Sequence, residues 1–325
     1  MRLTEREREL IAYFQLAADT SVEAAARDLG YKTHQARFTL QKLHENEVIY
    51  PYLIINHHLL GFLQFDVYFS RPHGVGEESS ALLNDCLSEQ RVPWVVEVGG
   101  DYQYGVTVLV RNPAELEVFF NRLSLTHGEV FREKSIVLCL GYSVFRRCYL
   151  GYRADDVNRI SCFGDGQTVD VDELDKRLIT ALSLFPTASL NQIASELSES
   201  RSTLQYRVDR LREAGVIGAV VYSLNTEKVG IQSFRFFLQL KSFHHEILES
   251  LFSFCDELGS VSYLTRCVGA WDFELTLEVE DSNKVTSFRS ALQSVLGSHL
   301  GSVKSVPVFR EQISGPYPFV DTVLD

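Results

Sequence analysis

The chain has 325 residues, a formal net charge of −12, 45% apolar residues and a mean hydropathy of −0.04. This length can hold two or more domains, and the composition is typical of a soluble globular protein with a sizeable core. The sequence contains no run of about 18 uninterrupted apolar residues, and the N-terminal MRLTERERELIAYF has no apolar signal core. We therefore expect a cytoplasmic protein without a membrane partner.

The charge and the cysteines exclude further classes. An acidic chain with a pI of 5.3 does not coat nucleic acid, although a local basic element remains compatible with binding. The six cysteines form no C-x-x-C pair, so zinc-finger and redox spacing are absent. We expect reduced thiols, no metal site and no cofactor.

Residues 4–49 are predicted to form helices, including a helix at VEAAARDLGY (22–31) and a following helix at KTHQARFTLQKLHENEV (32–48). In the second of these, Ala36, Leu40 and Leu43 have the spacing of a buried face. The residues on its polar face that we consider candidates for DNA contact are Lys32, Thr33, His34, Gln35 and Arg37.

The next segment, about 63–146, alternates strand and helix patterns in the order β-α-β-β-α-β, which is ferredoxin-like. Its segments are FLQFDVYF, ESSALLNDCLSEQ, WVVEVGG, YQYGVTVLV, PAELEVFFNRLSL and FREKSIVLCLGYSVF. The polar, glycine-containing CFGDGQTVD follows, and we predict a linker over 151–170.

Residues 172–217 predict three helices and a strand, the pattern of a winged helix-turn-helix. Ser189 is placed to cap the second helix, and Gly215 to end the third. In this motif the last helix enters the major groove of DNA with its polar face outward. The candidate DNA-binding residues are Arg201, Ser202, Thr203, Gln205, Tyr206, Arg207 and Arg210. The alternative is that these arginines form only the solvated face of an amphipathic helix.

The rest of the chain repeats the first half. Residues 4–49 align with 172–217 at an offset of 168 without a gap, and one inserted residue continues the match, with Gly61 over Gly230. Residues 232–311 again predict β-α-β-β-α-β. We therefore expect an α+β protein of two tandem units, each a winged helix-turn-helix followed by a ferredoxin-like domain. The expected segments are 1–60, 61–150, a linker over 151–170, 171–230 and 231–325.

Three motifs, DELDKRLITAL, SLNQIASEL and SRSTLQYRVDRLREAGVI, resemble the helix-turn-helix of the Lrp/AsnC family of transcriptional regulators. The loops GGDYQY (99–104) and VGAWDF (268–273) are similar to the glycine-containing loop of that family's ligand domain (RAM domain). The first copy departs from the pattern at KTHQARFTL, so we expect the second copy to dominate DNA contact.

The resemblance implies a regulator that binds double-stranded DNA, forms dimers or higher homo-oligomers, and responds to an amino acid or similar metabolite. With two units in one chain, it implies a covalent pseudo-dimer suited to an asymmetric operator. The implied effector-binding residues are Gly100, Asp101, Tyr102, Gly269, Trp271 and Asp272. The alternative is that these residues only shape a β-hairpin.

A transcriptional regulator would not be an enzyme. Two other functions are alternatives to this interpretation. Siroheme decarboxylases share the two-domain architecture, and His57-His58-Leu59-Leu60-Gly61-Phe62 is similar to their motif, whereas the second copy has no such histidine. The arginines expected after Val-Ile are replaced by Tyr50-Pro51 and Gly218-Ala219, and the simpler interpretation of His57 and His58 is a surface loop. The other rival is an assembly or metabolite-sensing subunit that does not bind DNA.

Overall fold

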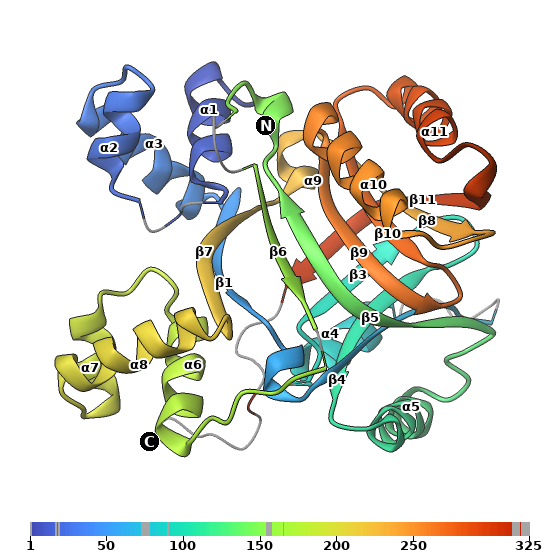
Figure 1. The fold of residues 1–325 in the computed structure, drawn as a ribbon, viewed down its shortest axis with the longest axis horizontal. Coiled ribbons are helices and arrows are strands. Elements are labelled where there is room, and N and C mark those ends of the chain that lie inside the picture. The colour runs from blue at the N-terminus through green and yellow to red at the C-terminus, as the bar shows by residue number, and fades with distance from the viewer. Residues whose placement is uncertain are drawn as a thin grey trace.

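In the computed structural model the chain folds as two copies of one unit, each a winged helix-turn-helix followed by a β-α-β-β-α-β half-sheet (Figure 1). This confirms the α+β class and the tandem arrangement that the repeat predicts. The structure describes residues 2–16, 18, 20–72, 79–89, 91–153, 158–164, 166–313 and 319. Within these residues, no helix combines the length and the apolar character needed to cross a membrane.

The two units have matching element orders. The first unit contains α1 (Glu5–Phe14), α2 (Val22–Asp28), α3 (Thr33–Glu45), β1 (Ile49–Ile55), β2 (Leu63–Ser70), α4 (Ser79–Ser88), β3 (Trp94–Val98), β4 (Tyr104–Val110), α5 (Pro113–His127) and β5 (Glu133–Phe145). The second unit contains α6 (Glu173–Leu184), α7 (Leu190–Leu197), α8 (Arg201–Glu213), β7 (Ile217–Leu224), α9 (Thr226–Val229), β8 (Gln232–Leu240), α10 (His245–Leu258), β9 (Val261–Gly269), β10 (Phe273–Val279), α11 (Asn283–Leu296) and β11 (Leu300–Ile313). Short 3-10 turns lie at His58–Leu60, Cys148–Leu150 and Gly297–His299.

The first helix of each unit begins with a capping box, in which two backbone N–H groups are satisfied reciprocally. Thr4 Oγ1 accepts from the Glu7 N–H at 3.3 Å, and the Glu7 carboxylate accepts from the Thr4 N–H at 2.8 Å. Asp172 and Asp175 make the same exchange at the start of α6, at 2.9 and 3.1 Å. The repeated cap fixes where each three-helix unit begins.

The two half-sheets join into one closed barrel. The strand order β2-β4-β3-β11-β8-β10-β9-β5 returns to its start because β5 also pairs with β2. Strands β5 and β11 are long enough, at 13 and 14 residues, to pair with both half-sheets. Closure leaves none of these eight strands with a free edge over its paired length.

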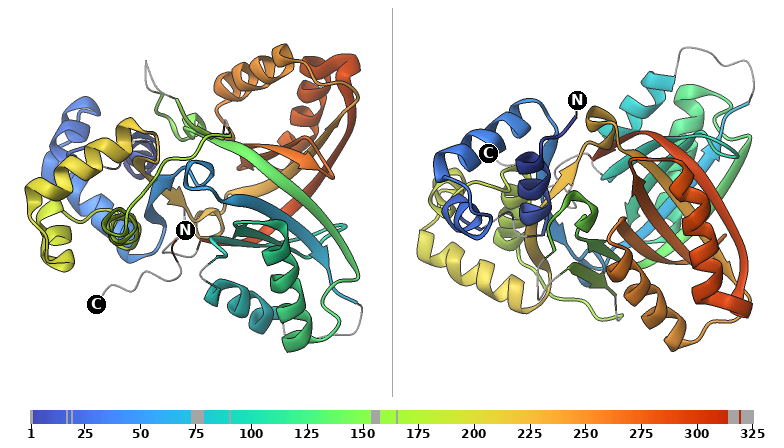
Figure 2. Two further views of the ribbon diagram at one scale, coloured as in Figure 1. Left: turned by 60° about the horizontal axis from the view of Figure 1, so that its bottom comes forward. Right: turned by 90° about the horizontal axis from the view of Figure 1, so that it is seen from above.

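The helices of the half-sheets cover the outside of this barrel (Figure 2). Helices α4 and α5 bury one apolar cluster against β2, β3 and β4, and α10 and α11 bury a second against β8, β9 and β10. The inside of the barrel contains a third cluster, centred on Tyr68, Tyr102, Phe237 and Trp271. The inward side chains of both units therefore meet in a single interior.

Three further strands lie between the barrel and the helix-turn-helix units. Residues 151–170, which we expected to form a linker, include β6 (Arg159–Phe163), which pairs with β5; residues 154–157 and 165 lie outside the described residues. The wing strands β1 and β7 pair with each other, with Ile49 opposite Leu224. This two-stranded sheet joins the two helix-turn-helix units, which lie together at one side of the barrel (Figure 1).

A buried ion pair joins the end of β5 to β10. Arg147 donates to both carboxylate oxygens of Glu278, at 2.6 and 2.8 Å, and both side chains are 3% exposed. The adjacent Arg146 donates to the carbonyl oxygens of Ala12 and Tyr13 at the C-terminal end of α1. A cation at a helix C-terminus is favourable, so the pair of arginines fixes α1 to the barrel.

We expect Glu278→Ala to destabilise the protein by about 3–5 kcal/mol, because it leaves the Arg147 charge buried without its carboxylate. Urea denaturation followed by far-UV circular dichroism measures this loss. The matched control is Glu280→Ala, which removes an exposed ion pair with Arg8 and is expected to cost about 0–1 kcal/mol. Equal losses in the two variants would contradict a structural role for the buried pair.

Candidate nucleic-acid interface and internal cavity

Helix α8 has the polar face that its sequence predicts. Ser200 caps the helix by accepting a hydrogen bond from the Thr203 N–H at 3.1 Å, while Leu204, Val208 and Leu211 are buried. Of the predicted DNA-binding residues of this helix, those that are exposed are Arg201, Ser202, Gln205, Tyr206 and Arg210, and those that are partly buried are Thr203 and Arg207.

Two of the arginines on α8 bind carboxylates of α6. Arg207 lies 2.7 Å from Asp172 and 2.8 Å from Asp175, and Arg210 also contacts Asp175, whose side chain is fully buried. Hydrogen bonds from Arg207 hold the pKa of Asp172 below its usual range. In this structure Arg207 therefore orients α8 on α6, and its contact with DNA stays a prediction.

Helix α3 of the first unit has a weaker cap and fewer free cations. Lys32 at its N-cap makes no side-chain cap bond, and Arg37 forms an ion pair with Glu23. Lys42 lies 3.1 Å from the buried Glu7, at the positions that correspond to Arg210 and Asp175. Of the other predicted residues of this helix, His34 is exposed and Thr33 and Gln35 are partly buried.

Helices α3 and α8 expose an aromatic ring at the same position. Phe38 on α3 is 67% exposed and Tyr206 on α8 is 70% exposed, and the two residues align at the offset of 168. The sequence analysis included Tyr206 and missed Phe38. The available signal was a large apolar residue at an otherwise polar position of the helix.

The predicted effector loops lie at turns of the barrel sheet. Tyr102 and Trp271 are buried inside the barrel, where the Trp271 and Phe237 ring centroids are 4.3 Å apart. The Asp272 carboxylate accepts from the Leu240 N–H at 2.7 Å, and the exposed Asp101 lies 3.3 Å from Lys304. Gly100 and Gly269 have φ values of +84° and +140° and are exposed. Their contact with an effector stays a prediction.

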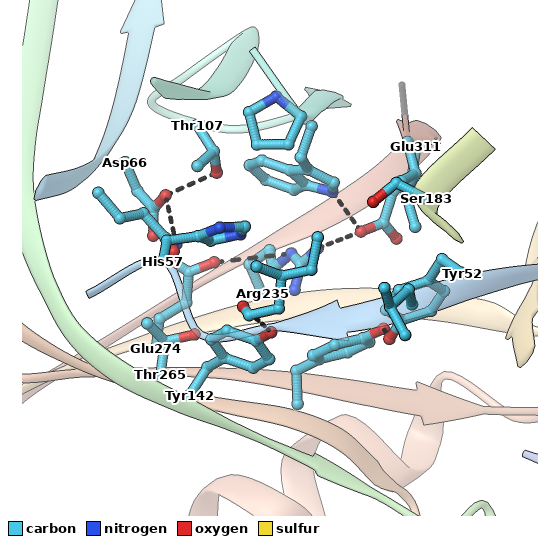
Figure 3. Close-up of a pocket in the computed structure, with 17 residues that line it drawn as sticks. Tyr52, His57, Asp66, Thr107, Tyr142, Ser183, Arg235, Thr265, Glu274 and Glu311 are labelled. Carbon is cyan, nitrogen blue, oxygen red and sulfur yellow. Dashed lines mark hydrogen bonds and ion pairs between the residues drawn. The ribbon is translucent and has the colours of Figure 1, made fainter. Parts of the chain in front are cut away.

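The sequence analysis missed a cavity of about 210 Å³ at the end of the barrel that faces the helix-turn-helix units (Figure 3). Its walls come from both half-sheets, from β1 and from α6. The charged and polar lining residues from the half-sheets are Gln64, Asp66, Thr107, Arg235, Thr265, Glu274 and Glu311. The aromatic lining residues are Tyr52, Trp94, Tyr142 and Tyr263, and His57 completes one side.

Arg235 is the central charge of this cavity, between two carboxylates (Figure 3). Its guanidinium lies 2.5 Å from Glu311 and 3.7 Å from Glu274. Trp94 Nε1 also donates to Glu311, and Tyr68 donates its hydroxyl hydrogen to Glu274 Oε1 at 2.6 Å. Glu311 is therefore the main partner of Arg235, and Glu274 makes a longer ion-pair contact with it.

Burial shifts the pKa values of the groups around Arg235. It raises the pKa of Glu274 to about 7, although Arg235 opposes the shift, and it raises the pKa of Asp66. Burial also lowers the pKa of His57 to about 3, so this ring is neutral near pH 7. His57 and His58 are both partly buried, unlike the surface loop suggested by the sequence. A concave site with several perturbed groups is a candidate for ligand binding.

Corresponding positions of the two units face each other across the cavity. At the offset of 169 that follows the inserted residue, Asp66 corresponds to Arg235 and Thr107 to Thr276. The contacts correspond as well, because Thr107 donates to Asp66 at 2.6 Å and Arg235 donates to Thr276. By the same offset Trp94 corresponds to Tyr263, and Tyr142 to Glu311. The cavity therefore lies where the two copies meet, and each copy contributes different side chains to it.

The sequence does contain a signal for this cavity. Asp66 and Arg235 are single charges inside otherwise largely apolar strands, in FDVYF and SFRFF, and Glu274 shares the strand FELTLEV with Glu278. A charge in a buried strand needs a partner or a functional reason. The separation between these strands along the chain hides the fact that they meet.

Comparisons with known proteins give two kinds of match. A family model described as winged helix-turn-helix DNA-binding matches residues 171–217. The HTH-type transcriptional regulator FL11 of Pyrococcus abyssi is 28% identical over 131 residues, which cover 40% of this chain and 84% of that protein. The proline dehydrogenase transcriptional activator of Rhizobium radiobacter is 26% identical over 141 residues, covering 43% and 86%.

Solved structures match the whole fold. The siroheme decarboxylase NirDL superposes with a TM-score of 0.62 at 13% identity, over 98% of this chain and 95% of that chain. Its complex with an iron-uroporphyrin III analogue gives a TM-score of 0.57 at 14% identity, over 95% and 92%. The tandem fold is thus shared with an enzyme, whereas the sequence similarity to curated proteins is with regulators over about two fifths of the chain.

We expect the stability of the protein to fall as the pH rises from about 5 to about 8, in part because of Glu274. Its folded pKa of about 7 exceeds its ordinary value of 4.5, so the folded state retains a proton that the unfolded state loses in this window. Glu274→Gln removes this contribution and should flatten the slope of unfolding free energy against pH, measured by urea denaturation at several pH values. The exposed control Glu280→Gln should keep the original slope, and an unchanged slope in Glu274→Gln would contradict the assignment.

Proposed function

We propose that the chain is a sequence-specific, DNA-binding transcriptional regulator that acts as a covalent pseudo-dimer. Residues 171–217 are a winged helix-turn-helix, and the curated relatives over two fifths of the chain are transcriptional regulators. The observation that carries the proposal is the outer face of α8. This capped helix exposes Arg201, Gln205 and Tyr206 opposite its buried residues, as a helix in the major groove requires.

The pairing of β1 with β7 supports the pseudo-dimer. It joins the two helix-turn-helix units in one molecule, as an isologous contact would join two chains. The helices α3 and α8 differ at most of their exposed positions, for example His34 against Ser202 and Arg37 against Gln205. The operator then has two unlike half-sites, of which the second unit reads the more specific one.

The proposal includes a homo-oligomer and a small effector. The loops that contain Gly100 and Gly269 are exposed at the end of β3 and after β9, where a second chain can approach them. Contact of an amino-acid-like effector there would use surfaces of two chains.

The test of this function is selection of bound sequences from random duplex DNA with the purified full chain at near-physiological salt. We expect an enriched motif with two unlike half-sites, and affinity that falls steeply as salt rises because cations on the protein displace counterions. Absence of both enrichment and salt dependence would overturn the proposal in favour of a subunit that does not bind DNA.

Matched variants compare the two recognition helices. We expect Arg201→Ala to weaken specific binding by about tenfold or more, because it removes a cation at the N-terminal end of α8. The control is Thr33→Ala at the corresponding position of α3, for which we expect a smaller loss. Among the described residues Arg201 is exposed and has no ion-pair partner, so the fold should be unaffected. Equal losses from the two variants would contradict dominance of the second unit.

A second candidate is a siroheme decarboxylase-like enzyme, favoured by the whole-chain fold match and by His57 in the cavity wall. The acidic side chains of the cavity argue against this enzymatic function. A uroporphyrin carries a carboxylate on each acetate and propionate side chain, whereas the described lining holds Asp66, Glu274, Glu311 and a single arginine. Arg235 is moreover already paired with Glu311. Like charges in a buried site disfavour such a ligand.

Titration with iron-uroporphyrin III, followed by its visible absorption, separates the enzyme from the regulator. We expect no saturable change in the absorption spectrum. A stoichiometric shift of the absorption band that is lost in His57→Ala would support the enzyme instead.

A further inference from the structure

The cavity at the end of the barrel is lined by more acidic than basic side chains. The described residues that line it include three carboxylates, Asp66, Glu274 and Glu311, and one cationic side chain, Arg235. Because Glu311 lies 2.5 Å from Arg235, these two charges largely cancel. Asp66 and Glu274 are each 5% exposed, and Glu274 has only a longer contact of 3.7 Å to Arg235. Burial disfavours the ionised forms of these two carboxyl groups, and a bound cation would stabilise those forms.

One of these carboxylates has an oxygen without a hydrogen-bond partner. Glu274 Oε1 accepts from Tyr68, but Glu274 Oε2 is buried and receives no hydrogen bond from the described residues. Buried polar atoms are nearly always satisfied, so an orphan acceptor at a cavity wall indicates a missing donor. An ammonium group offers three N–H donors and a positive charge, and it matches both deficits.

The aromatic and apolar lining residues favour an aromatic body. Trp94, Tyr142 and Tyr263 line the cavity, and Leu53 and Ile55 add apolar surface. The volume of about 210 Å³ exceeds the roughly 150 Å³ that holds a benzene molecule in an engineered cavity, which leaves room for a short side chain. An aromatic face also attracts cations, as the Arg235 guanidinium 4.9 Å from the Trp94 ring centroid illustrates.

The geometry points to a binding site for a small aromatic amine that carries no carboxylate. The amine lies at Asp66 and Glu274, and the ring lies between Trp94 and the tyrosines. Glu311 and Thr276 hold the two terminal nitrogens of Arg235, which leaves a ligand carboxylate only the buried Nε–H, 3.7 Å from Glu274. A carboxylate there would also lie beside the acidic side chains of Glu274 and Glu311, so an amino acid does not fit this cavity, which is also separate from the loops at Gly100 and Gly269.

The position of the cavity connects the ligand to the DNA-binding units. Tyr52 and Leu53 of β1 and Ser183 of α6 line it together with the barrel strands. Since β1 pairs with β7, a ligand in this cavity contacts the sheet that joins the two helix-turn-helix units. Coupling of occupancy to DNA affinity rests on the proposed function, whereas the binding site itself does not.

Four related probes test the charge requirement on the full chain without DNA: 2-phenylethylamine, its neutral analogue 2-phenylethanol, phenylalanine and 3-phenylpropionate. Binding is measured by calorimetry and by tryptophan fluorescence, with Trp94→Phe identifying the signal from the cavity. We expect 2-phenylethylamine to bind at least about tenfold more tightly than 2-phenylethanol, since a hydrogen-bonded charge is worth about that much or more. Phenylalanine and 3-phenylpropionate should not bind measurably. Equal binding of the amine and phenylalanine, preference for the acid, or no saturable binding of the amine would overturn the proposal.

Variants locate the amine within the cavity. Glu274→Gln and Asp66→Asn keep the shapes of their side chains and should each weaken 2-phenylethylamine binding by about tenfold while leaving 2-phenylethanol unchanged. The exposed control Glu280→Gln should change neither. Unchanged affinity of the amine in both cavity variants would overturn the site. DNA affinity measured without ligand tests the proposed function independently. A failure of the amine site can therefore be distinguished from a failure of the proposed DNA binding.

Discussion

Closure of two half-sheets into one barrel is the constraint on which the rest of the structure depends. The edge strand of each half-sheet pairs with the other half, β5 with β9 and β11 with β3, so the inward face of one unit is buried only against the other. The aromatic cluster around Tyr68 and Phe237 fills one part of the shared interior. The rest of that interior holds the charged residues of the cavity.

The arginines differ in whether their charges are paired within the fold or exposed to solvent. Arg147 is fully committed to Glu278, and Arg207 is held by Asp172 and Asp175, so both maintain the arrangement of elements. Arg201 lies at the exposed start of α8, where it is available to phosphate. The net charge of the chain says little about this distribution, because the proposed binding surface is a single helix face.

The repeat and the helical periodicity were sufficient to predict the elements and the tandem α+β architecture, because these depend on local patterns. The same patterns predicted the outward face of α8 but not the ion pairs of Arg207, since Asp172 and Asp175 lie on another helix. The cavity was out of reach for a similar reason. Arg235 and Glu274 lie on the paired strands β8 and β10 of one half-sheet, and barrel closure brings Asp66 of β2 into the same interior.

The opposite charges of Asp66 and Arg235 at corresponding positions have a consequence for how such a chain can evolve. In a dimer of identical units, this position would place two aspartates or two arginines near the same axis, and like charges in a buried site repel. Duplication within one chain permitted unlike residues at these positions instead, an acid in one copy and a base in the other. Once that change occurred, neither half could return to pairing with its own copy without a charge conflict. Each half has therefore become specific for its unlike neighbour, and separation of the two halves into self-pairing chains is disfavoured.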